Sequence, residues 1–174
     1  TELKILNIAR LTEQKDHMTI LKAINHSKIK HKIKFTIVGF GVLKNKLLSF
    51  VKKNKIKCEI IENKINLHKY YSQNDLFIFS SIYEGLPTVM VEAASYCMPI
   101  ISSNFKAGSK EILCSGKGGN IFEMKNYLKL SELIYKFYKN PQPFYKKEII
   151  CRKNIYKFSK KKNIKNFIGI LEKI

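Results

Sequence analysis

Short apolar runs alternate along this chain with longer segments of mixed polarity. The apolar runs are continuous rather than alternating, which is typical of parallel strands buried on both faces. Strands are expected at Lys4–Ala9, Phe35–Val38, Cys58–Ile61, Leu76–Phe79, Pro99–Ser102 and Asn120–Phe122. Helices are expected over about His17–Ser27, Leu43–Lys53, Leu67–Ser72, Val89–Tyr96, Lys110–Leu113, Tyr127–Tyr138, Pro143–Tyr156 and Lys161–Glu172. This alternation predicts an α/β fold, with a doubly wound, Rossmann-like parallel sheet flanked by helices.

Length and composition fit a single domain with a substantial core. The chain has 174 residues, of which 45% are hydrophobic, and no apolar tract is long enough to span a membrane. Its opening residues, Thr1–Leu6, look like a linker running into a strand, so we interpret the chain as the C-terminal piece of a longer, cytoplasmic protein. The four cysteines lack metal-ligand spacing and are expected to be reduced, buried thiols. The four histidines likewise show no metal or triad spacing.

The formal charge of +20 invites a nucleic-acid interpretation. Only Arg10 and Arg152 are arginines among the 33 basic residues, and the lysines are spread over nearly every expected helix. A nucleic-acid site usually gathers arginines with interleaved aromatic residues, so no specific nucleic-acid partner is expected. One denser group comprises Lys146, Lys147, Arg152, Lys153, Lys157, Lys160, Lys161, Lys162 and Lys165. It fits either a solvated helical face or attraction to an anionic membrane surface at the inner face of the cell membrane.

The most informative segment runs from Tyr83 to Glu92 and contains two carboxylates eight positions apart. Glu84 follows a predicted strand, and Glu92 lies about one turn into the next predicted helix. Helical side chains lean toward the N-terminus, so Glu92 can point at the loop that carries Glu84. Ligands of open α/β sheets bind at the carboxyl ends of strands. This pair could therefore hold sugar hydroxyls while helix N-terminal amides bind a phosphate.

Four blocks, in order and spanning most of the chain, resemble the C-terminal, donor-binding half of a GT-B retaining glycosyltransferase of family 4, in the glycosyltransferase group 1. The blocks are Ile8–Asp16, Ile37–Gly41, Glu84–Ala93 and Met98–Leu113. Two glutamates eight positions apart, Glu84 and Glu92, with an alanine directly after the second, form a fairly specific pattern for this family. The two glycines of the second block would be weak evidence on their own. The ending of the fourth block is similar to the branch that builds bacterial surface polysaccharides.

The resemblance implies a metal-independent site for a nucleotide-diphospho-sugar. Arg10 and Lys15 would meet the diphosphate, and an arginine in so arginine-poor a chain favours bidentate phosphate binding. Glu92 would hold the ribose hydroxyls, and Lys64 falls where the family's backbone meets the base. Glu84 would contact donor-sugar hydroxyls near the reacting carbon. Together with Arg10 and Lys15 it is a candidate catalytic residue, although we do not assign it a nucleophilic role.

Backbone amides at the helix mouth complete the implied site. The resemblance assigns the sugar and the distal phosphate to the segment made of Gly85, Leu86, Pro87, Thr88 and Val89. Alternatives from the residues alone remain open. Arg10 and Lys15 could be ordinary surface cations, and Glu92 could be a first-turn glutamate favoured by the helix dipole.

Three positions depart from the family pattern. Glu62 replaces a common glycine after the third strand, which alters the loop on the base side of the implied site. Cys97 replaces a glycine before the fifth strand and is interpreted as a small, buried packing residue. The segment starting at Lys106 replaces a proline-rich loop on the sugar side of the site. The sequence therefore does not identify the donor sugar.

The expected function is retaining transfer of a hexosyl group to a growing surface glycan or a lipid-linked acceptor. UDP-hexose or UDP-N-acetylhexosamine is the favoured donor, with GDP-mannose second. An N-terminal acceptor domain is expected to be absent from residues 1–174, so the isolated piece should bind donor weakly and not turn over. The alternatives are a GT-B nucleotide-sugar epimerase and a basic membrane- or nucleic-acid-docking module with a vestigial site.

Overall fold

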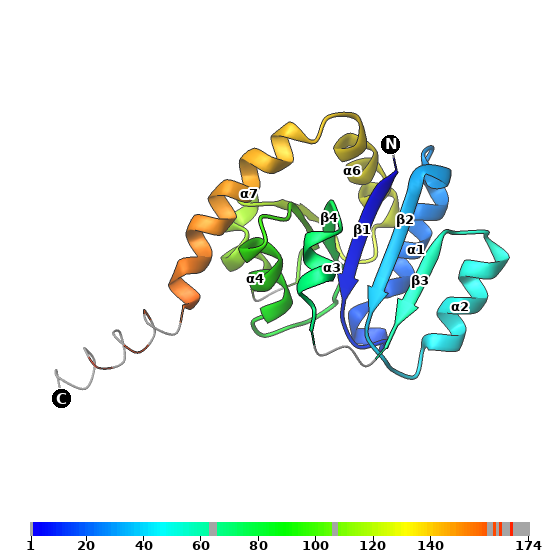
Figure 1. Cartoon of the computed structure of the whole chain (residues 1–174), viewed down its shortest axis with the longest axis horizontal. Coiled ribbons are helices and arrows are strands. Elements are labelled where there is room, and N and C mark those ends of the chain that lie inside the picture. The colour runs from blue at the N-terminus through cyan, green and yellow to red at the C-terminus, as the bar shows by residue number, and fades with distance from the viewer. Residues whose placement is uncertain are drawn as a thin grey trace.

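The computed structural model describes residues 2–62, 66–105 and 108–159, together with Lys162, Ile164 and Ile168. Its centre is a six-stranded sheet, in which all paired strands are parallel and the order is β3-β2-β1-β4-β5-β6 (Figure 1). The strands are β1 (Leu3–Ile8), β2 (Ile33–Val38), β3 (Cys58–Ile61), β4 (Leu76–Phe79), β5 (Ile100–Ser103) and β6 (Asn120–Phe122). The predicted parallel, doubly wound sheet is confirmed.

The helices lie between and after the strands, as predicted. They are α1 (His17–His26), α2 (Lys44–Lys53), α3 (His68–Ser72), α4 (Thr88–Ser95), α5 (Ser109–Ile112), α6 (Tyr127–Lys139) and α7 (Gln142–Ile155). Short 3₁₀ segments occur at Glu13–Lys15, Lys30–Lys32, Cys114–Gly116 and Tyr156–Phe158. The helix predicted over Lys161–Glu172 falls almost entirely outside the described residues. Among the described helices, none has the length and apolar character needed to cross a lipid bilayer.

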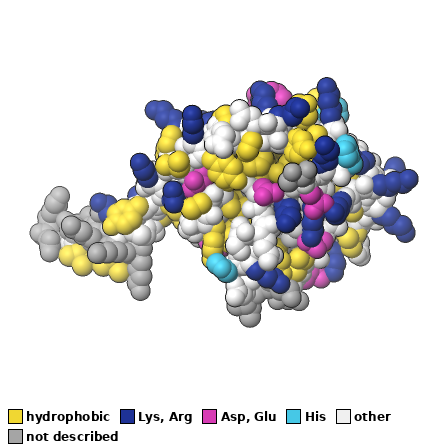
Figure 2. Space-filling view, turned by 45° about the horizontal axis from the view of Figure 1, so that its top comes forward, with side chains coloured by type: hydrophobic (Ala, Val, Ile, Leu, Met, Phe, Trp, Pro, Cys, Tyr) yellow, Lys and Arg dark blue, Asp and Glu magenta, His cyan; other side chains and the backbone are white. Residues whose placement is uncertain are grey.

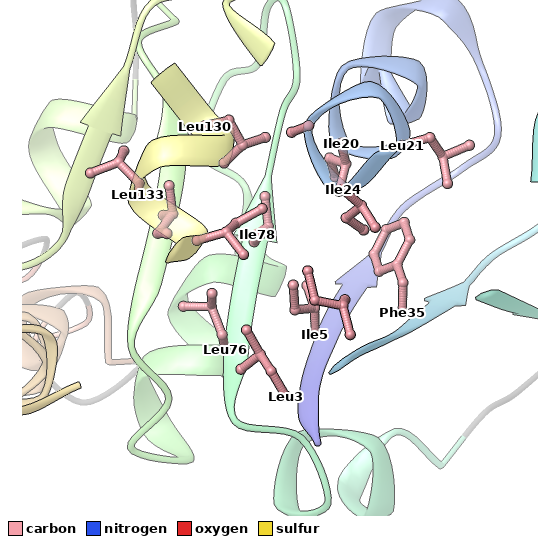
Figure 3. Close-up of a cluster of buried hydrophobic side chains, with 14 of the residues drawn as sticks. Leu3, Ile5, Ile20, Leu21, Ile24, Phe35, Leu76, Ile78, Leu130 and Leu133 are labelled. Atoms are coloured by element: carbon pink, nitrogen blue, oxygen red, sulfur yellow. The ribbon is translucent and has the colours of Figure 1, made fainter. Parts of the chain in front are cut away.

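Two apolar clusters pack against opposite faces of the sheet, which makes three layers. On one face, α1 and α6 cover β1 and β4, with Ile20, Ile24 and Leu130 pointing toward Ile5 and Ile78 (Figure 3). On the other face, α3, α4, α5 and α7 bury the alternate strand residues; these include Leu6, Phe77, Phe79 and Ile100. Successive strand residues point to opposite faces, so both must be apolar. This is why the strands appear in the sequence as continuous apolar runs.

The chain reverses its direction of winding between β1 and β4. It passes outward from β1 to β3, then returns to place β4 on the other side of β1, where Ile5 pairs with Leu76 and Leu6 with Phe77. The loops that follow these two strands leave toward opposite sides of the sheet. Such a topological switch point opens a crevice at the carboxyl edge, and it is where ligands of this architecture bind.

Two glycines allow the loop after β2 to press against the loop after β1. A Cβ atom on Gly39 would lie 1.9 Å from the carbonyl oxygen of Ala9, and one on Gly41 would lie 2.6 Å from that of Leu11. Both distances are too short for any side chain. The Leu11 amide also donates to the Phe40 carbonyl over 2.8 Å. The glycines of this block therefore fix the path of the loop that begins the predicted phosphate site.

Cys97 differs from its predicted role. It is exposed, and its φ of 59° places it in the left-handed region directly after α4. Its amide donates to Ala94 O, and the next amide, of Met98, donates to Ala93 O, which is the hydrogen-bond pattern of a Schellman helix end. The prediction of a buried packing residue was wrong because the position is set by backbone conformation, for which glycine is preferred. Of the four cysteines, only Cys151 is buried.

We predict that Cys97→Gly raises the free energy of unfolding by about 1 kcal/mol, because glycine adopts the left-handed region without a Cβ penalty. Cys97→Ala is the matched control, since it also removes the thiol that accepts a 3.3 Å hydrogen bond from Arg152 but keeps the Cβ. Urea unfolding of the three proteins measures the difference. Equal stabilities for the glycine and alanine variants would contradict the backbone explanation.

A buried histidine begins α1. His17 is only 1% exposed, and within the described residues neither ring nitrogen has a hydrogen-bond partner. Burial lowers the pKa of His17 to about 4, and the nearby Lys15 charge acts in the same direction. The folded protein therefore holds a neutral imidazole, whereas the unfolded chain takes up a proton below about pH 6.5. Between about pH 6.5 and pH 4, proton binding to His17 therefore stabilises the unfolded state relative to the folded state.

We predict that stability falls as the pH is lowered from 6.5 to 4, and that His17 accounts for about 2 kcal/mol of the loss by pH 5. His17→Leu should remove this part of the pH dependence, because leucine cannot bind a proton. The measurement is urea unfolding at pH 7 and pH 5. His26→Leu, at an exposed histidine of the same helix, is the control. The account is wrong if both variants lose the same stability as the wild type between these pH values.

Candidate functional site at the carboxyl edge of the sheet

Hydrogen bonds tie together the two loops that flank the switch point. The hydroxyl of Ser80, just after β4, donates to the carbonyl oxygens of Lys15 at 2.8 Å and Asp16 at 2.9 Å. The Ile82 amide donates to Gln14 O over 2.8 Å. Ser80 is 1% exposed, so these bonds are shielded from water. They hold the loop that carries Glu84 against the loop that carries Arg10 and Lys15.

Lys15 and Glu84 form an ion pair across the crevice. The side chains are 13% and 12% exposed, and the Lys15 ammonium also lies 5.7 Å from the centre of the Phe79 ring. Gln14 supports the pair by donating to Tyr83 O at 2.8 Å and, more weakly, to the Glu84 carboxylate at 3.5 Å. The structure thus brings together Lys15, which was predicted to bind the diphosphate, and Glu84, which was predicted to bind the sugar hydroxyls. Gln14 was not predicted, because nothing in the sequence marks a lone glutamine as a loop support.

Arg10 lies two residues beyond β1 and is exposed. In contrast to Lys15, its guanidinium has no ion-pair or hydrogen-bond partner among the described residues. An arginine held at the crevice without an internal carboxylate is available to an external anion. Its planar fork matches two phosphate oxygens at once.

The two helices that begin at this edge differ in how their N-termini are capped. At α1, Asp16 accepts from the Thr19 amide at 3.3 Å and from the Thr19 hydroxyl at 2.7 Å, and burial raises the pKa of this aspartate. At α4, Pro87 is the N-cap, and no side chain caps the helix. The first amides of α4 and its positive dipole end are therefore free of a side-chain cap and open to a ligand anion, whereas at α1 the Asp16 carboxylate already occupies the Thr19 amide.

The loop before α5 packs against the segment between Glu84 and α4. Gly108 has a φ of +86°, and a Cβ there would lie 2.6 Å from Gly85 O and 2.9 Å from the Pro87 ring. This close approach explains the glycine and fixes the position of the α4 entry. Gly85, Leu86 and Thr88 remain exposed at the surface of the crevice, and Val89 is half-buried. Lys106 lies outside the described residues.

Glu92 is in the second turn of α4, half-buried, and accepts a 2.8 Å hydrogen bond at Oε2 from the Tyr71 hydroxyl of α3. This hydrogen bond gives a partner to a carboxylate whose neighbours in the sequence are apolar. The alternative of a first-turn glutamate does not fit, because the first turn of α4 contains no acidic residue. Among the described contacts Glu84 and Glu92 do not meet, since each has its own partner.

The base-side loop after β3 is only partly described. Lys64 lies outside the described residues, so its predicted role stays a prediction. Glu62, which departs from the family pattern, forms an ion pair with Lys44 at the start of α2. The carboxylate at this position therefore has a cation partner on the neighbouring helix rather than pointing unpaired into solvent.

The crevice combines fixed positive groups with carboxylates that can accept hydroxyl hydrogen bonds. Arg10 and the open end of α4 suit a diphosphate, and the two glutamates suit sugar hydroxyls. Within the described residues, no group of three or more His, Cys, Asp and Glu side chains is placed to hold a metal ion. The arrangement can thus bind an anion and polar rings by side chains and amides together.

The basic charge is distributed over several surfaces. On the face seen in Figure 2, Lys and Arg side chains are scattered around the molecule, with Asp and Glu among them near its centre. The exposed side of α7 carries Tyr145, Ile149 and Ile150 beside Lys146 and Lys153. This mixture is compatible with either a solvated face or an anionic membrane surface, so the membrane contact stays a prediction.

A separate cavity of about 450 Å³ lies between β6, α6 and α7. Its lining includes Lys136, Lys139 and Lys147, so it could also attract an anion. Lys136 is paired with Glu132, and Lys147 donates to the Asn120 side chain at 2.6 Å. None of the predicted site residues lines this cavity, which makes it a competing location for any anionic ligand.

Comparison with known proteins supports the same assignment. An uncharacterised glycosyltransferase of Methanocaldococcus jannaschii is 37% identical over 112 residues, which are 63% of this chain and 28% of that protein. An N-acetylgalactosamine-N,N'-diacetylbacillosaminyl-diphospho-undecaprenol 4-alpha-N-acetylgalactosaminyltransferase of Campylobacter jejuni is 28% identical over 126 residues, 70% of this chain and 33% of that one. The chain thus spans about a third of the length of these relatives.

A crystal structure of HepE from Anabaena in complex with UDP has the same fold, with a TM-score of 0.90 at 14% identity. The match covers 99% of this chain and 49% of that one. The family model for Glycosyl transferases group 1 matches residues 1–162. Together with the parallel sheet, this match shows that the chain belongs to the glycosyl transferases group 1 family and carries a Rossmann-like domain of the GT-B fold.

Proposed function

We propose that this chain binds the nucleotide-diphospho-sugar donor of a retaining glycosyltransferase, in the crevice between β1 and β4. The observation that carries the proposal is the convergence, at the switch point, of an unpaired Arg10, the Lys15–Glu84 pair and the uncapped end of α4. No single group among these is specific. Together they supply cations, amide donors and hydroxyl acceptors within one crevice.

The diphosphate is assigned to Arg10, Lys15 and the first amides of α4. The bond between the sugar and the phosphate breaks with negative charge building on the departing diphosphate. Fixed donors that face this charge stabilise the transition state, and they serve the role that a metal ion has in other transferases. Each charge-assisted hydrogen bond contributes about 1.5–3 kcal/mol. We therefore propose a donor site that is independent of metal ions.

Glu84 is assigned to the hydroxyls of the donor sugar, at the reacting end of the crevice. In the free protein its carboxylate is neutralised by Lys15. When the donor binds, the Lys15 ammonium can share its protons between Glu84 and a phosphate oxygen, because it has three donors. The acceptor hydroxyl then attacks from the side that the diphosphate leaves. The new bond forms with retained configuration, and the departing phosphate takes the proton.

Relatives favour a particular donor and acceptor class. The printed name of the Campylobacter relative describes transfer of N-acetylgalactosamine to a diphospho-undecaprenol-linked sugar, and the Anabaena structure holds UDP. We therefore favour a UDP-hexose or UDP-N-acetylhexosamine donor and a lipid-linked or growing glycan acceptor. Because the chain spans about a third of its relatives, acceptor binding and full activity are assigned to the complete protein.

We predict that ligand-observed NMR detects UDP and UDP-sugars but not GDP or GDP-mannose. Arg10→Ala should weaken UDP binding by about tenfold, since it removes a charge-assisted bond to phosphate. Glu92→Ala should weaken it to a similar degree, through loss of the ribose contact. Arg152→Ala is the matched control, because it removes the chain's other arginine far along on α7.

Three outcomes are informative for this proposal. Loss of binding in the Arg10 and Glu92 variants, with the Arg152 variant unchanged, supports the site. Equal weakening by both arginine variants indicates a general charge effect and contradicts it. Binding of DNA that falls steeply with salt, without any nucleotide-sugar binding, would favour the alternative of a basic docking module.

A further inference from the structure

Tyr71 is placed to control the carboxylate of Glu92. Its hydroxyl donates to Glu92 Oε2 at 2.8 Å and lies 3.5 Å from the Val89 carbonyl oxygen. Tyr71 is 2% exposed, so water competes little for this bond. Within the described residues Glu92 Oε1 has no protein hydrogen-bond partner. One oxygen of the carboxylate is thus held by the protein, and the other is free for a ligand.

The Tyr71 ring itself is held by neighbouring aromatic side chains. Tyr96, just after α4, stacks on it with ring centres 4.9 Å apart and planes 7° from parallel. Phe77 of β4 also lies against it, with ring centres 6.1 Å apart and planes tilted by 38°. The hydroxyl of Tyr96 lies 3.1 Å from His68 Nδ1, which links the stack back to α3. The Tyr71 hydroxyl therefore has a defined position relative to α4.

The Tyr71 hydroxyl keeps its proton and so remains a hydrogen-bond donor to Glu92. Burial and the adjacent Glu92 carboxylate together raise the pKa of Tyr71 far above its ordinary value. The phenol accordingly keeps its proton and always presents a donor to Glu92. A glutamate on a helix has several rotatable bonds, and fixing one oxygen removes much of this freedom before a ligand arrives.

We propose that Tyr71 is a positioning residue for nucleotide recognition: it holds Glu92 Oε2 so that Oε1 is set to accept from the two ribose hydroxyls. This inference rests on the proposed function, since it needs the ribose at Glu92. It goes beyond that function by assigning the ribose selectivity to a pair of residues on two helices, 21 positions apart in the sequence. A purely structural role for Tyr71 would affect stability without affecting hydroxyl selectivity.

The test is a comparison of dissociation constants for UDP and 2′,3′-dideoxy-UDP by isothermal titration calorimetry. The wild type should bind UDP about tenfold more tightly, because two hydroxyls donate to a preset carboxylate. In Tyr71→Phe this ratio should fall to about two- or threefold. Tyr70→Phe is the matched control, because this neighbouring tyrosine is also buried but its hydroxyl has no hydrogen bond among the described contacts.

Each result separates the two proposals. If the wild type discriminates, Glu92→Ala does not, and Tyr71→Phe keeps the full ratio, then the proposed function stands and the Tyr71 inference is overturned. If Glu92→Ala keeps the ratio, or UDP does not bind, the ribose is not at Glu92 and both proposals fail. A uniform loss of affinity in Tyr71→Phe, with the ratio intact, also overturns the inference.

A second variant covers the case in which Tyr71→Phe does not fold. Tyr96 is 38% exposed, so Tyr96→Leu should be tolerated while removing the stacked ring that fixes Tyr71. In this variant, we expect the ratio of the dissociation constants for 2′,3′-dideoxy-UDP and UDP to fall by at least about twofold. An unchanged preference in folded Tyr96→Leu would overturn the inference on its own.

Discussion

The site depends on one contact, the attachment of the loop after β4 to the loop after β1. Ser80 makes it by donating to two carbonyl oxygens of the first loop, and the Ile82 amide adds a third bond. These loops leave neighbouring strands toward opposite faces of the sheet, and Gln14 and the Lys15–Glu84 ion pair add further links between them. The attachment holds the loop of Glu84 against the loop of Lys15, which is the side of the crevice where we propose that the sugar binds.

The Lys15–Glu84 pair illustrates how such a site is held ready. A nearly buried ion pair contributes little net stability, because desolvation offsets the attraction. In the proposed site, the pair places two opposite charges in a crevice where each can face a different part of the donor. Arg10 has no such partner among the described residues, and in the proposed site it provides the net positive charge that attracts a phosphate. The same logic applies to Glu92, where Tyr71 satisfies one oxygen and leaves the other available.

Much of the fold was predictable, because its signals are local. Continuous apolar runs identified each strand, and the boundaries of β3, β4 and β6 agree with the prediction. The contacts within the site were not predictable, because they join residues 64 to 70 positions apart through hydrogen bonds that leave no pattern in the sequence. Gln14 was missed for this reason, and Tyr71 was missed because its hydrogen bond to Glu92, across 21 positions, likewise leaves no pattern in the sequence. Cys97 was misinterpreted because side-chain size was considered where the backbone conformation decides.

The most direct test of the account is a crystal structure of the chain with UDP bound. We predict the diphosphate against Arg10 and the N-terminal amides of α4, with the ribose hydroxyls at Glu92 Oε1. The Lys15 ammonium should then lie between Glu84 and a phosphate oxygen. Nucleotide bound instead in the lysine-lined cavity between α6 and α7, with the crevice between β1 and β4 empty, would contradict the central claim.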